Sequence, residues 1–484
     1  MQFNSFKCIV FFPLAVICFY IIPHKYRKHW LLVCSYYFYM CWNPLHVIIL
    51  FLATVTTYIC TILMGRNDAK RKAWLLVCII INTGLLVFFK YIGFLAQNIL
   101  ALLPQLESSS STPFYESIVL PVGISFYTFQ LIGYAVDVYR HDTIATRNFL
   151  SFALFASFFP QLVAGPIERA NFLLPQIEKV KTRYDRDIYL DLYTGFYQMM
   201  WGFFLKLVIA DRLSIMVDNA LANYSHIGLI GIIVSVFYFT IRIYCDFNGY
   251  SFIARGAAKC LGIDLSQNFK QPYFAKSIHD FWKRWHITLT QWFTRYLYIP
   301  LGGNRKGKLN KLINVMIVFL CSGLWHGASW HYVVWGCFHG LLYVVEELFK
   351  IRVYKDKTNC LSKIVGGVRI VATFVCVSLG WLFFFAPSVK VAVSIMKQAV
   401  MNINASGLNY LGIKKEDAVI LALAILVMVI VDYLHEREKS IFLIINTKLK
   451  GVRHIIYVGI IWAIIIFGVY GGQYDASKFI YFQF

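Results

Sequence analysis

Three short motifs within residues 280–328 decide how the rest of the chain is interpreted. They are DFWKRWH at residues 280–286, YIPLGGNR at residues 298–305 and SGLWHGA at residues 322–328. Aromatic and cationic side chains crowd the first motif, whereas the last belongs to an apolar run and carries one histidine between small residues. Because a titratable imidazole is costly to keep in apolar surroundings, we expect His326 to have a function.

The composition of the 484 residues indicates a membrane protein. Hydrophobic residues make up 59% of the chain and charged residues only 14%. The apolar runs extend from end to end without a long polar region, which predicts one membrane-embedded domain over residues 1–484 with a motif core at about 118–345. A secreted soluble protein is excluded, because a water-soluble domain could not bury this much apolar surface.

The formal charge of +22 is explained by membrane topology. Lys and Arg cluster between the apolar runs, as they do in the cytoplasmic loops of multi-pass proteins. We therefore predict a multi-pass protein of the inner (plasma) membrane, with the lipid bilayer as its surroundings and no nucleic-acid partner. The same clusters would attract anionic headgroups and phosphorylated ligands on the cytoplasmic side.

Hydropathy predicts an all-α fold with about eleven transmembrane helices. A tight helical hairpin is expected where Asn43-Pro44 interrupts an apolar run, and a second pair of helices where Gly327-Ala328-Ser329 interrupts residues 312–349. Residues 149–164 have basic residues on both flanks, which favours a re-entrant helix over a span. Residues 255–310 contain no run long enough to cross a bilayer, so we expect them to lie along or dip into the inner face.

His326 and His286 are the two candidate catalytic residues. Burial favours the neutral form of a histidine, which suits a general base near neutral pH. The alternative for His326 is a structural histidine that is hydrogen-bonded into a helix contact. The alternative for His286 is an interfacial amphipathic helix whose tryptophans, Trp282, Trp285 and Trp292, form one aromatic face at headgroup depth.

The cations around these motifs could hold the phosphates of a nucleotide-like acyl carrier, or they could belong only to the inner-face charge signal. This set comprises Lys283, Arg284, Arg295, Arg305 and Lys306.

A metal site is not expected. His326 and His331 are five residues apart rather than the three or four that place two ligands on one helix face, and no H-E-x-x-H motif or acidic cluster accompanies them. No tightly bound cofactor is predicted. The chain also lacks a G-x-S-x-G elbow, a P-loop and a G-x-G-x-x-G fingerprint, so serine hydrolase, nucleotide hydrolase and Rossmann interpretations have no support.

Taken together, the motifs resemble the membrane-bound O-acyltransferase (MBOAT) family, and within it the alginate O-acetyltransferase branch. The resemblance extends from residue 3 to about residue 339 and is weak in the C-terminal spans. It is carried by the stretches at residues 120–130, 159–161, 164–167, 246–251, 280–286, 298–305, 324–330, 335–336 and 339–340.

This resemblance implies a ring of tilted helices around a central funnel, where a cytoplasmic thioester donor such as acetyl-CoA meets an acceptor from the other side. By motif position, His326 matches the active-site histidine of the family and His286 its second histidine. Thr294-Arg295 stands where relatives often have Arg-Asp, so no catalytic role is assigned there. Candidate residues for donor or substrate binding are Trp282, Lys283, Arg284, Trp285, Asn304, Arg305, Trp325, Asp246 and Asn248.

The function that we expect is O-acetyl transfer to hydroxyls of an exported cell-envelope polysaccharide, alginate-like or another glycan. His326 would act as the general base and His286 would orient the reactants or stabilise charge. A separate extracytoplasmic acetyltransferase is a possible partner. Three alternatives stay open: D-alanyl transfer to teichoic acid, transport of acyl groups or lipid-linked sugars without chemistry, and delivery of the donor to another acetylase.

Overall fold

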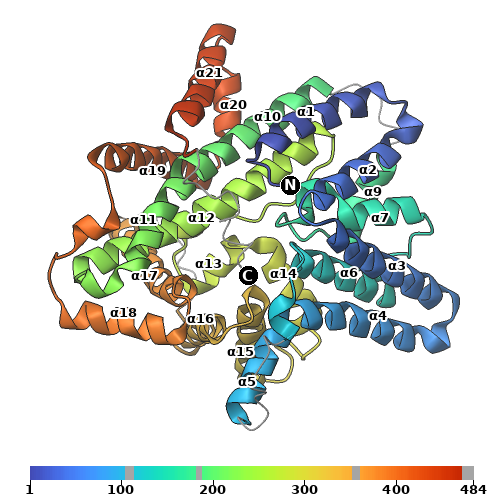
Figure 1. The fold of residues 1–484 in the computed structure, drawn as a ribbon, viewed down its shortest axis with the longest axis horizontal. Coiled ribbons are helices and arrows are strands. Elements are labelled where there is room, and N and C mark those ends of the chain that lie inside the picture. The colour runs from blue at the N-terminus through green and yellow to red at the C-terminus, as the bar shows by residue number, and fades with distance from the viewer. Residues whose placement is uncertain (104–113, 181–187, 352–359, 471–484) are drawn as a thin grey trace. The chain divides into compact units, whose positions relative to one another are not determined.

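The computed structural model describes residues 1–103, 114–180, 188–351 and 360–470, and these fold into helices joined by turns and short loops (Figure 1). No strand occurs in these four ranges. The all-α prediction is thus confirmed. The chain divides into two compact units, one with Met1–Phe196 and Ala254–Ser266 and one with Tyr197–Ile253 and Gln267–Gln483.

The first unit holds the N-terminal helices. They are α1 Phe6–Ile21, α2 Arg27–Met40, α3 Pro44–Arg66, α4 Arg71–Leu86, α5 Ile92–Leu102, α6 Ile124–Tyr139, α7 Phe149–Ser157, α8 Phe159–Leu162 and α9 Ala170–Lys179. Helices α3, α4 and α6 lie side by side (Figure 1). The predicted hairpin break is confirmed: Asn43 caps α3 by accepting a hydrogen bond from the backbone N–H of Leu45 at 2.9 Å, and Pro44 is the first residue of the helix.

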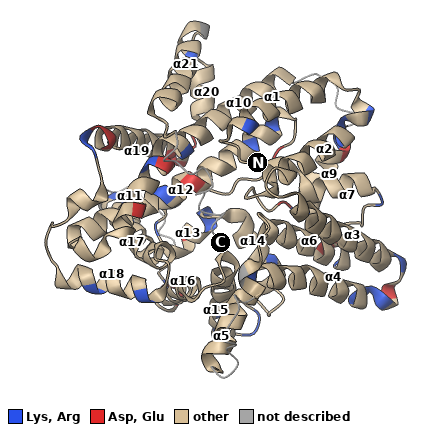
Figure 2. Ribbon diagram, in the orientation of Figure 1, with Lys and Arg blue, Asp and Glu red and all other residues tan. Residues whose placement is uncertain are grey.

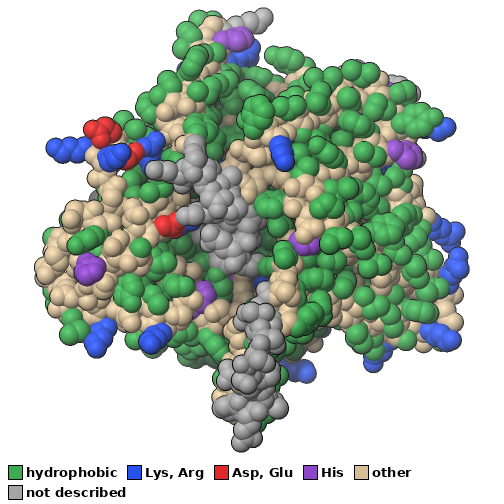
Figure 3. All heavy atoms as spheres, in the orientation of Figure 1, with side chains coloured by type: hydrophobic (Ala, Val, Ile, Leu, Met, Phe, Trp, Pro, Cys, Tyr) green, Lys and Arg blue, Asp and Glu red, His purple; other side chains and the backbone are tan. Residues whose placement is uncertain are grey.

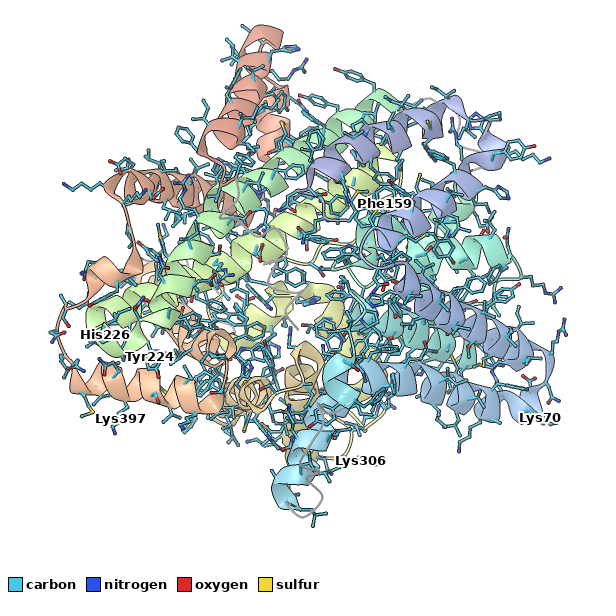
Figure 4. The ribbon with its side chains drawn as sticks, viewed as in Figure 1. Lys70, Phe159, Tyr224, His226, Lys306 and Lys397 are labelled. Atoms are coloured by element: carbon cyan, nitrogen blue, oxygen red, sulfur yellow. The ribbon has the colours of Figure 1, made fainter. Side chains whose placement is uncertain are left out.

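Residues 149–164 form two short buried helices, α7 and α8, and not one spanning helix. With nine and four residues, neither helix could cross a bilayer. The ring of Phe159 packs against Phe11 and Phe38 with centroid distances of 5.6 and 5.5 Å (Figure 4). The expectation that this stretch does not span therefore agrees with the structure, and its re-entry from one side stays a prediction.

The second unit holds the remaining helices. They are α11 Asp211–Ala222, α13 Ile278–Arg284, α14 Ile287–Phe293, α15 Lys308–His326, α16 Trp330–Leu348, α17 Cys360–Phe385, α18 Val389–Met401, α19 Lys415–Glu436, α20 Ile441–Asn446 and α21 Lys450–Phe467. Helices α10 Ile188–Phe203 and α12 Leu229–Cys260 contribute residues to both units. Two π-helical segments, η6 Phe204–Ala210 and η9 Thr294–Tyr298, continue α10 and α14.

Within the described ranges, six helical segments are long and apolar enough to cross a membrane: Pro44–Arg66, Asp68–Leu102, Leu229–Cys260, Lys308–His326, Ser362–Phe385 and Lys415–Glu436. Shorter apolar helices accompany them, so a polytopic membrane protein is confirmed, while the count of about eleven crossings stays a prediction. Hydrophobic side chains cover much of the face in Figure 3. Cations gather at turns such as the one between α3 and α4 (Figure 2), where Lys70 lies (Figure 4).

Helices α15 and α16 pack closely as an antiparallel pair because glycines, which have no side chain, lie where the two backbones meet. A Cβ atom on Gly336 would lie 2.3 Å from the backbone oxygen of Phe319, and one on Gly323 would lie 2.3 Å from that of Tyr332. Small residues permit this backbone approach in membrane helices. The three-residue break at 327–329, predicted from Gly327-Ala328-Ser329, is confirmed and leaves His326 at the end of α15.

Replacement of Gly336 by alanine should destabilise this helix pair. The added methyl would meet backbone atoms, which cannot move aside as a flexible side chain could. We expect a loss of roughly 1–3 kcal/mol, seen as a lower unfolding temperature of the detergent-solubilised protein. Gly367→Ala is the matched control because nothing lies within 4 Å of a Cβ there. Equal unfolding temperatures for the two variants would contradict the packing argument.

Candidate active site

One cavity of about 380 Å³ in the second unit is lined by both candidate histidines. Its walls come from α13, α14, η9, the loop before α15, and helices α15 and α16. The lining residues are His279, Trp282, Lys283, Trp285, His286, Leu289, Thr290, Phe293, Thr294, Tyr298, Asn304, Lys311, Val315, Val318, Phe319, Ser322, His326 and Tyr343. A volume of this size suits a small group or one arm of a larger ligand.

His326 is the last residue of α15, and its ring lies among aromatic rings. The centroid distances are 5.0 Å to Trp325, 5.0 Å to Trp335 and 5.3 Å to Phe384, and the residue is only 4% exposed. The small Gly327 that follows it makes room for a neighbour, since a Cβ there would come within 2.1 Å of the Tyr332 ring. The imidazole thus borders the cavity from an otherwise apolar wall.

His286 occupies a sharp turn between α13 and α14. Its backbone is left-handed, with φ 43° and ψ 56°, a conformation that costs a non-glycine residue free energy unless its surroundings hold it. Hydrogen bonds on both sides do so: the N–H of Ile287 donates to the Asn268 oxygen and the N–H of Lys270 donates to the Arg284 oxygen, each at 2.9 Å. The turn aims the imidazole at the cavity.

The side chain of His286 is buried against rings of two other helices. Its centroid lies 4.7 Å from that of Phe247 on α12 and 5.8 Å from that of Trp325 on α15. Trp325 therefore contacts both candidate histidines. Burial lowers the pKa of His286 from its ordinary 6.5 to about 3, because a charged ring would be desolvated in this position. The ring is consequently neutral at physiological pH.

Helix α13 is held at its N-terminal end by side-chain acceptors. Ser277 caps the helix by accepting from the N–H of Asp280 at 3.0 Å. The two oxygens of Glu346 on α16 accept from the N–H groups of Ile278 and His279 at 2.7 and 2.9 Å. The carboxylate satisfies two backbone donors that a helix leaves free at its start and also interacts favourably with the helix dipole.

Trp282, Trp285 and Trp292 do not form one aromatic helix face. Helix α13 ends at Arg284, and the turn at His286 separates Trp282 and Trp285 from Trp292 on α14. Trp282 is 8% exposed and Trp285 1%, so both lie inside the second unit rather than on its surface. The interfacial amphipathic helix is therefore wrong, because the chain reverses where the sequence pattern assumed a continuous helix.

Comparison with known proteins places this chain in a family. The model of the MBOAT, membrane-bound O-acyltransferase family matches residues 143–388, about half of the chain, including both histidines. The chain belongs to this family. As an MBOAT protein it is a membrane acyltransferase, as its motifs predicted.

Three relatives illustrate the range of proteins that the chain resembles. It is 36% identical over 388 residues to a probable alginate O-acetylase, AlgI, of Pseudomonas putida, covering 79% of this chain and 76% of that protein. It is 32% identical over 401 residues to a peptidoglycan O-acetyltransferase of Helicobacter pylori, covering 78% and 74%. A teichoic acid D-alanyltransferase of Bacillus subtilis is 29% identical over 274 residues, covering 54% and 68%.

The structure brings together some, but not all, of the residues predicted for this MBOAT site. Trp282, Lys283, Trp285 and Asn304 line the cavity with the two histidines. Asn304 is exposed, which places it at the rim of the cavity, and it accepts a hydrogen bond from the hydroxyl of Tyr298.

Other predicted residues lie away from the cavity lining. The Arg284 guanidinium binds carboxylates, as described below, and Arg305 is exposed in the loop before α15, beside Lys306 (Figure 4). Asp246 is buried on α12, where its carboxylate lies 2.6 Å from the Lys206 ammonium. Asn248 is also buried on α12. Arg284 and Asp246 thus lie outside the lining of the cavity.

Several cavity residues were missed, although a helical repeat could have revealed part of them. Val315, Phe319, Ser322 and His326 are spaced by four, three and four residues, which is the spacing of one helix face. Counting back from His326 at this spacing would have predicted Val315, Phe319 and Ser322 on the same helix face as His326. No comparable signal marks Asn268, whose backbone and side chain hold the turn at His286: the Thr288 hydroxyl donates to its Oδ1 at 2.7 Å.

The lowered pKa of His286 has a measurable effect on stability. In the unfolded chain this residue binds a proton near pH 6.5, whereas in the folded protein it does so only near pH 3. Its contribution to stability is complete above about pH 6.5 and is lost as the pH falls toward 3. We expect His286→Gln to reduce the decrease in unfolding temperature between about pH 7 and about pH 4. An equal decrease in both proteins would contradict the burial of a neutral imidazole at 286.

Proposed function

We propose that this acyltransferase moves an acetyl group from a cytoplasmic thioester, such as acetyl-CoA, to hydroxyls of an exported cell-envelope polysaccharide. The observation that carries the proposal is that His286 and His326, 40 positions apart in the sequence, line one cavity. The proteins that match about four fifths of the chain at 32–36% identity include those named alginate O-acetylase and peptidoglycan O-acetyltransferase, which supports an O-acetyl group and a glycan acceptor.

The proposed reaction is a proton abstraction coupled to acyl transfer. His326 removes the proton from an acceptor hydroxyl while the oxygen attacks the thioester carbonyl carbon. The bond from carbon to sulfur then breaks, and the leaving thiolate takes up the proton that His326 removed. His286, neutral and buried, carries one ring N–H that can donate to the developing oxyanion or hold the donor carbonyl in place. Exclusion of water by the surrounding aromatic rings strengthens both interactions.

The other residues of the cavity offer both apolar and polar contacts to a thioester donor. The apolar side chains of Leu289, Phe293 and Val315 line part of the cavity, whereas Lys283 and Asn304 supply polar groups to it. We place the protein in the inner (plasma) membrane, with its donor on the cytoplasmic side. The acetyl group reaches the polysaccharide directly or through a separate extracytoplasmic acetyltransferase.

D-alanyl transfer to teichoic acid is the second candidate, and it is less well supported. The D-alanyltransferase relative matches 54% of the chain, against 79% for the probable alginate O-acetylase. The two candidates differ in the donor, because D-alanyl transfer requires an aminoacyl thioester. Supplying acetyl-CoA and an aminoacyl carrier thioester separately to the purified protein distinguishes them. Loss of O-acetyl groups from one envelope polymer in cells that lack the protein would identify the acceptor.

Replacement of His326 by alanine should abolish acyl transfer while the protein still inserts and folds. Loss of a general base costs roughly 10²- to 10⁴-fold in turnover. The measurement is transfer of labelled acetyl by the purified protein in liposomes. His226→Ala is the control because this histidine is exposed on the turn between α11 and α12 (Figure 4). Near-normal transfer by His326→Ala would reject the assignment.

Replacement of His286 should lower turnover more than it weakens donor binding. A group that acts on the developing charge contributes to the transition state and less to the ground state. We expect His286→Ala to reduce kcat with little change in the KM for the donor. His286→Gln, which keeps a donor group, should retain more activity than the alanine variant. Unchanged acyl transfer by His286→Ala would remove this residue from the mechanism.

A further inference from the structure

The Arg284 guanidinium, which the sequence suggested as a phosphate-binding group, is engaged by a carboxylate from a distant helix. Its Nη1 and Nη2 atoms lie 2.6 and 3.1 Å from the two oxygens of Glu436, the last residue of α19. Its Nε donates to Asp280 at 2.9 Å. This is the paired, two-bond geometry that makes Arg–carboxylate contacts strong and directional. The edge of the guanidinium that would bind a phosphate thus binds the Glu436 carboxylate instead.

The contact between Arg284 and Glu436 is made at the end of α13 that leads into His286. Arg284 is the last residue of α13 and precedes His286 by two positions. Helix α13 has seven residues, too few to be stable alone, and the next turn is left-handed. Its first turn is fixed by Glu346, so its other end needs a separate anchor. The side chains of Arg284 and Glu436 are 18% and 29% exposed, which reduces solvent screening of the pair without removing it.

We propose that Glu436 is a positioning residue for acyl transfer: through Arg284 it fixes the end of α13 and thereby the placement of His286 in the cavity. Glu436 lies outside residues 143–388, which match the family model, so it ties a helix of the C-terminal part to the active site. Glu436 itself does not line the cavity. The inference rests on the proposed function, because it assumes that His286 serves acyl transfer.

Charge reversal separates positioning from donor binding. The variants are Glu436→Arg, Arg284→Glu and the double variant with both changes, assayed for acetyl transfer in liposomes. If the pair positions His286, each single change lowers kcat by roughly 10- to 100-fold with little change in donor KM, because an ionic hydrogen-bonded contact is lost and a like-charge contact created. The double variant restores the pair with opposite polarity and recovers part of the activity, because Asp280 then faces a carboxylate at position 284.

Donor binding by Arg284 predicts the opposite pattern. Glu436→Arg would then lower the donor KM without reducing kcat, and the double variant would be as inactive as Arg284→Glu. Either result overturns the proposal. Glu438→Arg, an exposed position two residues beyond α19, is the control for adding a cation nearby. Glu436→Gln guards against a folding failure, since it keeps the shape of the side chain; wild-type kcat in this variant would also overturn the proposal.

A readout independent of activity keeps this proposal distinct from the proposed function. Hydrogen–deuterium exchange of the amides in residues 278–290 should be faster in Glu436→Arg than in the wild type and should return toward the wild-type rate in the double variant. Exchange that is unaffected by Glu436→Arg overturns the positioning role. If the wild-type protein transfers no acetyl group while exchange responds as expected, the proposed reaction fails and the anchoring of His286 stands.

Discussion

A left-handed turn at His286 is the constraint on which the candidate active site depends. The conformation is unfavourable for histidine, so it persists only because the neighbouring backbone and side chains fix it. Asn268 supports the turn from one side, and α13 leads into it from the other. Strain of this kind often accompanies functional residues, because it places a side chain where an ordinary helix or loop would not.

His326 is positioned by close helix packing and not by a left-handed turn. Glycines allow α15 and α16 to approach closely, and the short break between them leaves His326 at the end of α15 within a cluster of aromatic rings. Trp325 packs against both imidazoles and so lies between His286 and His326 in the packing. The cavity bordered by α13, α14 and α15 is therefore shaped by helix packing, and both apolar and polar side chains line it. A cavity that holds two buried imidazoles beside apolar side chains is suited to moving a proton.

Much of this arrangement was predictable from the sequence, since it follows from local patterns. Composition and charge clusters indicated an all-helical membrane protein, and Gly327-Ala328-Ser329 marked the break after His326. The turn at His286 was not predictable in this way, because left-handed backbone is usually signalled by glycine or asparagine. The contact between Arg284 and Glu436 was not predictable either, because the two residues lie 152 positions apart and no local pattern connects them.

The most direct measurement is an experimental structure of the protein bound to a non-hydrolysable acetyl thioester analogue. If the two histidines form one acyl-transfer site, the acyl carbonyl will lie in the cavity of the second unit, within hydrogen-bonding distance of the His286 ring and with space for an acceptor hydroxyl beside His326. An acyl group bound elsewhere, with this cavity filled only by protein side chains or lipid, would contradict the shared site.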